Sequence, residues 1–329
     1  HCAHLGVHGA SEGARVKPRW WWLLPGALIA WAVFGRGWQP PNTLRLPPVR
    51  GAGATFPAPL YQRWFSALQV REGLSLSYQP LDSGAGVDQL LAGLVDFAGS
   101  DRDSATGMDR RLEDPRWLRI PVTAGAIAVA YNQPNCRLQL SRAQLRLILN
   151  GRIRNYQQLG CPAAPITVVV RSDAASGTTA NLLSYLQHSG GAWHSSAVES
   201  VASNDAMATA LVQQPGAIGY LETVYLNGRH GLRAAALQNS SGAFVMPSDT
   251  AVQIALQQGG RDPGAYPLTT YSWLVTPRSG LGAKGAVLKR AITYGLSASG
   301  QASARTLGYA ALPEAVLENA RRSLEAWQP

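Results

Sequence analysis

One stretch decides how the chain is organised, and it reads Val168-Val169-Val170-Arg171-Ser172-Asp173-Ala174-Ala175-Ser176-Gly177-Thr178-Thr179. The apolar, β-branched run over 166–170 is typical of a buried parallel strand. Ser176 and the Gly-Thr-Thr after it are capping and turn residues, and apolar side chains at helical spacing follow over 182–186. The stretch therefore predicts a strand, a polar loop and the start of a helix.

The polar loop in this stretch has the donors that bind an oxyanion. A helix N-terminus leaves backbone N–H groups unpaired and carries partial positive charge. The hydroxyls of Ser176 and Thr178 add donors, and Arg171 brings a full charge that Asp173 can hold in place. An ordinary helix cap beside a solvated arginine explains this loop, taken alone, equally well.

Other loops of the chain repeat this plan. The segments 53–57 and 82–86 each place Gly, Ser or Thr between an extended stretch and a helical pattern, and the tip 99–101 ends a short strand at a carboxylate. Strands that alternate with helices predict an α/β fold with mainly parallel pairing. Ligands of such folds bind beyond the carboxyl ends of the strands, where Thr55, Ser83 and Asp101 are expected.

Two apolar stretches, 120–131 and 267–276, are long enough to run between two domains, and 329 residues suffice for both. Further patterns predict a helix after the first glycine-rich loop, helices over 141–149 and 248–258, and two closing helices over 282–298 and 313–327. No clear strand is predicted before Gly51.

The composition excludes several classes of function. The net charge is +10, but Lys and Arg are scattered, so we expect no nucleic-acid partner. His188, His194 and His230 lack metal-ligand spacing. The pair Gly51 and Gly53 lacks the third glycine of a dinucleotide site, and no Gly-x-Ser-x-Gly sequence is present. We therefore expect no metal, no cofactor and no catalysis.

The N-terminal segment predicts export. Three basic residues precede an apolar run that ends in the small-x-small triplet Ala30-Trp31-Ala32. We expect residues 1–32 to be a cleaved export signal and the Pro- and Gly-rich residues 33–48 to be a linker. The alternative is an uncleaved membrane anchor through residues 20–34. Either reading places the folded part in the periplasm or another extracytoplasmic compartment.

Two cysteines, Cys136 and Cys161, remain after the predicted cleavage, because Cys2 lies in the segment that is removed. An even number of cysteines in an exported chain indicates a disulfide. Two buried free thiols are the alternative.

Asp101 is an unusual residue beside an anion. An ionised carboxylate repels an anion unless the ligand donates a proton to it, which protonated phosphate can do and fully ionised sulfate cannot. The wrong ligand would then leave a buried acceptor unpaired. From the residues alone, a plain turn position before Arg102 is the favoured interpretation.

Several motifs together are those of a known family. The first four are Gly51-Ala-Gly-Ala-Thr-Phe-Pro-Ala-Pro-Leu-Tyr61, Ser83-Gly-Ala-Gly86, Val95-Asp-Phe-Ala-Gly-Ser-Asp101 and Arg171-Ser-Asp-Ala-Ala-Ser-Gly-Thr-Thr179. The others are Thr123-Ala-Gly-Ala-Ile-Ala-Val-Ala-Tyr131, Gly216-Ala-Ile-Gly-Tyr220 and Leu307-Gly-Tyr-Ala-Ala-Leu-Pro313. Over about residues 49–327 the chain resembles the phosphate-binding proteins of bacterial phosphate ABC transporters.

This resemblance implies a type II periplasmic-binding-protein fold with two lobes, two crossing strands and the ligand in the cleft between them. We expect lobe 1 to comprise 49–120 and 271–329, and lobe 2 to comprise 121–270. The family's phosphate-binding residues match Thr55, Phe56, Ser83, Asp101, Arg171, Ser176, Gly177 and Thr178.

The expected function is to bind inorganic phosphate as an exported monomer and to deliver it to ABC permease subunits. The alternatives are a secreted phosphatase, with Ser176 as the candidate nucleophile, and a binder or sensor of another oxyanion. Two departures from the family pattern bear on the site. An extra alanine stands at 174 or 175, and Asp82 is a second carboxylate beside Ser83, which would weaken anion binding unless it points away.

Overall fold

The computed structural model describes residues 46–102, 110–173, 175–187, 198–258 and 261–329. The predicted export signal 1–32, the alternative anchor 20–34 and most of the linker 33–48 lie outside these ranges, as does Ala174. No helix within the described ranges is both long and apolar enough to cross a membrane.

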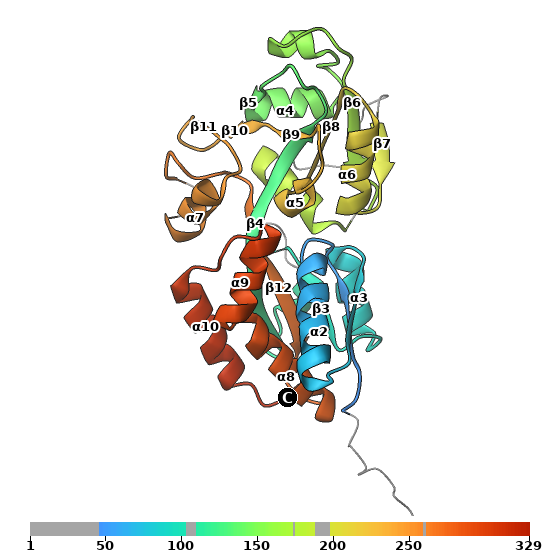
Figure 1. The fold of residues 1–329 in the computed structure, drawn as a ribbon, viewed down its shortest axis with the longest axis vertical. Coiled ribbons are helices and arrows are strands. Elements are labelled where there is room, and N and C mark those ends of the chain that lie inside the picture. The colour runs from blue at the N-terminus through green and yellow to red at the C-terminus, as the bar shows by residue number, and fades with distance from the viewer. Residues whose placement is uncertain (1–45, 103–109, 174, 188–197, 259–260) are drawn as a thin grey trace, which may run out of the picture. The chain divides into compact units, whose positions relative to one another are not determined.

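A single mixed sheet, nine-stranded among the described residues, is the frame of the fold (Figure 1). Its strands follow the order β2-β1-β3-β12-β4-β8-β6-β7, and β9 also pairs with β4. The strands are β1 (Val49–Gly53), β2 (Leu76–Pro80), β3 (Phe97–Ser100), β4 (Trp117–Tyr131), β6 (Thr167–Arg171), β7 (Val198–Val201), β8 (Ala217–Glu222), β9 (Arg233–Ala234) and β12 (Thr269–Pro277). A small second sheet has the order β11-β10-β5 and consists of β5 (Gln139–Leu140), β10 (Ala236–Gln238) and β11 (Phe244–Val245).

The long strand β4 joins two groups of elements. Its residues 117–126 pair with β12, and its residues 127–131 pair with β8, both antiparallel. We call lobe 1 the elements built on the β12 side of β4 and lobe 2 those built on its β8 side (Figure 1). The expected long strands at 120–131 and 267–276 are thus β4 and β12, and the expected α/β class is correct. The exact residue boundaries between the lobes stay a prediction.

Helices cover the sheet in both lobes (Figure 1). In lobe 1 they are α2 (Ala58–Glu72), α3 (Ser83–Leu91), α8 (Ala283–Gly295), α9 (Ala298–Leu307) and α10 (Glu314–Glu325). The others are α4 (Arg142–Leu149), α5 (Gly177–Leu186), α6 (Asn204–Gln213) and α7 (Asp249–Gln258). Short 3₁₀ turns occur at η1 (Arg110–Leu112), η2 (Tyr156–Leu159) and η3 (Thr223–Leu226).

The first glycine-rich segment is not wholly a loop, because Gly51 and Gly53 belong to strand β1. The expectation that no clear strand precedes Gly51 was wrong, because β1 begins at Val49. Glycine is needed here for close packing: a Cβ on Gly51 would lie 2.1 Å from the Phe97 ring, and one on Gly53 would lie 2.2 Å from the Gly99 carbonyl oxygen. The two side-chain-free residues let β1 pair tightly beside β3.

The C-terminal part contains one helix more than expected. The helix predicted over 282–298 corresponds to α8, which ends earlier, at Gly295. A separate helix, α9, begins at Ala298. The Ser297 hydroxyl accepts the Gly300 N–H and caps α9, which explains why the chain starts a new helix there. Helix α6, which follows β7, was also missed.

The predicted disulfide is present between Cys136, which follows β4, and Cys161, which follows η2. Cys136 is buried in the main hydrophobic core. Because 25 residues separate the cysteines, the bridge removes a sizeable loop-closure entropy from the unfolded chain.

Replacing both cysteines, Cys136→Ser with Cys161→Ser, should therefore lower the free energy of unfolding by about 3 kcal/mol. Denaturant unfolding without reductant measures this loss. Wild-type protein unfolded in reductant is the control and should lose a similar amount. Equal stability of variant and wild type would show that the bridge does not stabilise the fold.

Candidate functional site

The start of helix α5 brings together residues that are far apart in the sequence. Ser176 caps the helix, since its hydroxyl accepts the Thr179 N–H at 3.3 Å. Gly177, the first helical residue, lies against lobe 1: a Cβ there would be 2.5 Å from Ser83 Oγ and 3.0 Å from Asp101 Cβ. The predicted strand-loop-helix unit is confirmed, and its helix N-terminus faces Ser83 and Asp101 of lobe 1.

Lobe 1 supplies its part of the site from the ends of β1 and β3 and the start of α3. Thr55 follows β1, Ser83 is the first residue of α3, and Asp101 follows β3 directly. The Asp101 backbone N–H donates to Ser83 Oγ at 3.2 Å. All three residues are buried, so the expected loops do converge at the carboxyl ends of neighbouring strands.

Phe56 takes a different position from the polar residues. Its ring is fully buried and lies 5.1 Å from the Tyr309 ring, and its carbonyl accepts the Tyr309 hydroxyl at 2.6 Å. A contact of Phe56 with a ligand would therefore come through its backbone N–H, as the family resemblance implies.

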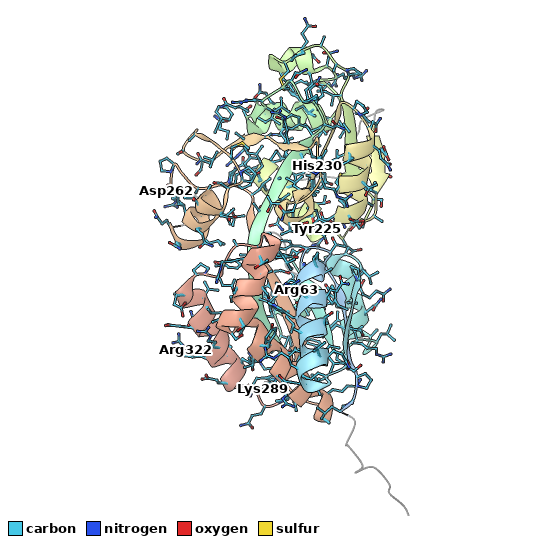
Figure 2. All side chains as sticks on the ribbon, in the orientation of Figure 1. Arg63, Tyr225, His230, Asp262, Lys289 and Arg322 are labelled. Atoms are coloured by element: carbon cyan, nitrogen blue, oxygen red, sulfur yellow. A yellow bond between two sulfur atoms is a disulfide. The ribbon has the colours of Figure 1, made fainter. Side chains whose placement is uncertain are left out.

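Hydrogen bonds join the two lobes directly at the site. Asn204 Nδ2 donates to Thr55 Oγ1 at 2.7 Å, and the Tyr225 hydroxyl donates to the Thr55 carbonyl at 2.5 Å. The Gly84 N–H donates to the Ala175 carbonyl at 3.2 Å. Tyr225 lies at the junction of the lobes in Figure 2 and borders a groove of about 940 Å³ that reaches the site at Thr55. The lobes are in contact, and the polar side chains between them are buried.

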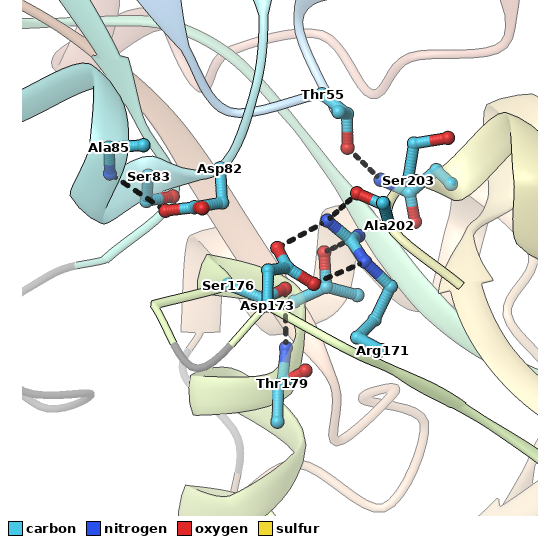
Figure 3. A network of polar contacts seen from close by, with 12 residues as sticks. Thr55, Asp82, Ser83, Ala85, Arg171, Asp173, Ser176, Thr179, Ala202 and Ser203 are labelled. Atoms are coloured by element: carbon cyan, nitrogen blue, oxygen red, sulfur yellow. Dashed lines mark hydrogen bonds and ion pairs between the residues drawn. The ribbon is translucent and has the colours of Figure 1, made fainter. Parts of the chain in front are cut away.

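Arg171 is held in one orientation by hydrogen bonds on both sides. Its Nε and Nη2 donate to the two carboxylate oxygens of Asp173 at 2.9 and 2.7 Å, and Nη2 also donates to the Ala202 carbonyl at 3.3 Å (Figure 3). Nη1 has a contact of 3.5 Å with Thr178 Oγ1. The Arg171 side chain is only 1% exposed. The expectation that Asp173 holds this guanidinium is confirmed, and Nη1 is the nitrogen nearest to Thr178.

The two departures from the family pattern are Asp82 and the extra alanine at 174 or 175. Asp82 caps α3, where its Oδ1 accepts the Ala85 N–H at 2.8 Å. Its carboxylate is thus engaged with the helix, which is the favourable outcome for an anion site. Ala174 lies outside the described residues, whereas the Ala175 backbone forms one of the contacts between the lobes.

The carboxyl of Asp101 is deeply buried and receives a hydroxyl. Its Oδ1 accepts the Ser272 hydroxyl at 2.7 Å, and its backbone carbonyl accepts from Asn181 and Thr270. Burial raises the pKa of Asp101 well above its usual range, and the nearby charge of Glu222 raises it further. The Ser272 hydrogen bond and the Arg171 charge act in the opposite direction.

Two residues of the site were missed from the sequence, Asn204 and Glu222. Asn204 begins α6 and contacts Thr55, and Glu222 ends β8 and accepts the Thr178 hydroxyl at 2.7 Å. Burial raises the pKa of Glu222. Glu222 comes two residues after the Gly216–Tyr220 motif, a position at the carboxyl end of a strand that could have drawn attention to it.

The arrangement suits an anion better than a metal ion. Backbone N–H groups at the starts of α3 and α5, the hydroxyls of Thr55, Ser83 and Thr178, and the Arg171 guanidinium all lie in one enclosed region. Within the described ranges, no group of three His, Cys, Asp or Glu side chains could hold a metal ion.

Comparisons with known proteins agree with this geometry. The family profile of the PBP superfamily domain matches residues 38–297. The phosphate-binding protein PstS of Haemophilus influenzae is 30% identical over 229 residues, which cover 63% of this chain and 67% of that protein. PstS 3 of Mycobacterium tuberculosis is 33% identical over 218 residues, covering 59% of this chain and 58% of that protein. The matches thus span about two thirds of the length of these relatives, or somewhat less.

Solved structures show the same fold. A putative phosphate ABC transporter substrate-binding protein with bound phosphate from Clostridium perfringens has a TM-score of 0.67 at 17% identity, covering 81% of this chain and 100% of that one. A phosphate-binding protein from Stenotrophomonas maltophilia has a TM-score of 0.64 at 20% identity, covering 84% and 93%. The predicted two-lobed fold is therefore correct, and the chain belongs to the PBP superfamily and, within it, to the family of PstS phosphate-binding proteins.

Proposed function

We propose that this chain is an exported binding protein that holds inorganic phosphate between its lobes and delivers it to the membrane subunits of an ABC permease. The observation that carries the proposal is the meeting of buried donors from both lobes around Gly177, with the buried cation Arg171 and the buried acceptor Asp101 beside them. The names of the relatives, which include an ABC transporter substrate-binding protein, support the same function.

In this proposal each part of the site has a distinct task. The N–H groups at the start of α5 and the hydroxyls of Thr55, Ser83, Ser176 and Thr178 donate to phosphate oxygens. Arg171 supplies the charge, and Asp173 limits the rotamers that the guanidinium can adopt. Because these side chains are buried, the interactions are stronger than they would be on the surface.

Asp101 provides the choice between oxyanions. A phosphate that carries a proton can donate it to the buried carboxylate. Sulfate has no proton at neutral pH, so one of its oxygens would face the carboxylate oxygen with no hydrogen bond between them. The Ser272 hydroxyl already engages Oδ1, which fixes the carboxylate in the site.

The phosphatase alternative receives no support from the position of Ser176. Its hydroxyl oxygen is the cap of α5, where it accepts the Thr179 N–H. The relatives named above are described as binding proteins. A phosphatase role would require that the wild-type chain hydrolyses a chromogenic phosphate ester and that Ser176→Ala abolishes this hydrolysis.

Calorimetric titration of the purified chain tests the function. Phosphate should bind at neutral pH, and sulfate should bind far more weakly. Equal binding of the two anions would contradict the role of Asp101, and binding of a different oxyanion in place of phosphate would contradict the proposal.

Asp101→Asn should narrow the preference for phosphate over sulfate by about 1–3 kcal/mol, because the amide can donate to sulfate whereas the carboxylate repels it. The ratio of the two dissociation constants measures the effect. Asp249→Asn removes the same charge from an exposed position and is the matched control. An unchanged ratio in Asp101→Asn would show that Asp101 does not determine the selectivity for phosphate over sulfate.

Arg171→Ala should weaken phosphate binding by about 2–5 kcal/mol, because it removes a buried charge and leaves Asp173 without its partner. Titration gives the affinity, and Arg146→Ala, which removes an exposed arginine, should leave it unaltered. If both variants bind phosphate alike, Arg171 does not contact the anion.

A further inference from the structure

Glu222 is a buried carboxyl that faces the site and lacks a full set of partners. It is the last residue of β8 and is 0% exposed. Its Oε1 accepts the Thr178 hydroxyl at 2.7 Å, whereas Oε2 has no hydrogen bond of good geometry among the described residues. The Asn204 side chain lies near this carboxyl and lowers its pKa, against the effect of burial. An ionised oxygen without a donor is costly at such a position, and a neutral carboxylic acid is less so.

The contact with Glu222 limits what Thr178 can do for a ligand. A hydroxyl has one proton to donate. While that proton points to an ionised Glu222, Thr178 Oγ1 offers an anion only its lone pairs. If Glu222 instead carries the proton, it donates to Thr178 Oγ1, and the Thr178 proton is released to turn toward the anion.

The charges around Glu222 also favour its acid form once an anion enters. Arg171 on β6 is the cation that acts on both Glu222 and Asp101, and Asp173 already occupies two of its nitrogens. With Asp101, Asp173 and Glu222 all ionised, the three carboxylates outnumber this cation before phosphate adds its own negative charge. Like charges in an enclosed site are unfavourable, so one proton is expected to remain there.

Other groups that face Glu222 are neutral. They come from α6, η3 and the segment after α9, and they are Asn204, Tyr225 and Tyr309. Burial raises the pKa of both tyrosines and keeps them protonated, so neither adds a charge. The net charge around Glu222 therefore depends on Arg171 and the carboxyls.

We propose that Glu222 is a positioning residue that carries a proton in the phosphate-loaded site, donates it to Thr178 Oγ1 and thereby directs the Thr178 hydroxyl proton to the anion. The inference rests on the proposed phosphate function. The proton comes from solvent water, and no other bond is made or broken. Burial raises the pKa of Asp101 as well. In this proposal Asp101 is nevertheless the ionised acceptor of the loaded site, because Ser272 donates to it and the ligand supplies a second proton.

Infrared difference spectroscopy of the wild-type chain with and without phosphate tests the protonation directly. The loaded protein should show the carbonyl stretch of a protonated carboxyl, and isotope labelling of glutamate should shift this band. Labelling of aspartate should leave it in place. A loaded protein with no glutamate-dependent band would overturn the inference, whether or not any variant folds.

Variants test whether that proton orients Thr178. Glu222→Leu should weaken phosphate binding by at least about tenfold, and Glu222→Gln, whose amide can donate to Thr178 Oγ1, should restore most of the affinity. In a Thr178→Val background the two Glu222 variants should bind equally, since the hydroxyl that they orient is gone. Glu199→Gln on exposed β7 is the control, and thermal unfolding of each variant checks its folding.

The outcomes separate the two proposals. A Glu222→Gln variant that binds more than tenfold tighter than wild type would show that Glu222 is ionised in the complex and would overturn the inference. A Glu222→Gln variant that binds phosphate as weakly as Glu222→Leu would overturn the inference as well. Failure of the wild-type chain to bind phosphate at all would instead refute the proposed function.

Discussion

The close approach of two chain segments at Gly177 is the constraint on which the site depends. Lobe 2 meets Ser83 and Asp101 of lobe 1 at this residue, and a single methyl group would keep them apart. The approach places the N-terminus of α5 against the C-terminal end of β3 and the first residue of α3, so donors from three elements face one region. Bonds from Asn204 and Tyr225 to Thr55 then close the lobes over it.

Electrostatic balance is the second requirement of this enclosed region. Three carboxyls and one guanidinium lie around it, and burial makes each uncompensated charge expensive. Of these three, Asp173 holds the Arg171 guanidinium, and Asp82, which is not among them, caps α3. Asp101 and Glu222 remain, and the geometry gives them different partners: a serine hydroxyl donates to one, and a threonine hydroxyl lies between the other and the ligand region.

Local sequence patterns predicted much of this fold. The run of valines before Arg171 and the cap at Ser176 predicted β6 and α5, because a buried strand and a capped helix are specified by neighbouring residues. The division after Gly295 and the strand at Gly51 were missed. The first depends on one serine cap inside a helical pattern, and the second on the Phe97 ring, which packs where a side chain on residue 51 would be.

The sequence by itself determined the class of the fold, the two long strands, the disulfide and the loops that carry Thr55, Ser83, Asp101 and Arg171. Only the tertiary structure decided which further side chains join them. Asn204 is 149 residues from Thr55, and Glu222 is 44 residues from Thr178. Neither contact leaves a local pattern, because each depends on how β8 and α6 pack beside β4 and β6, and that packing is set by pairing between distant segments rather than by adjacent residues.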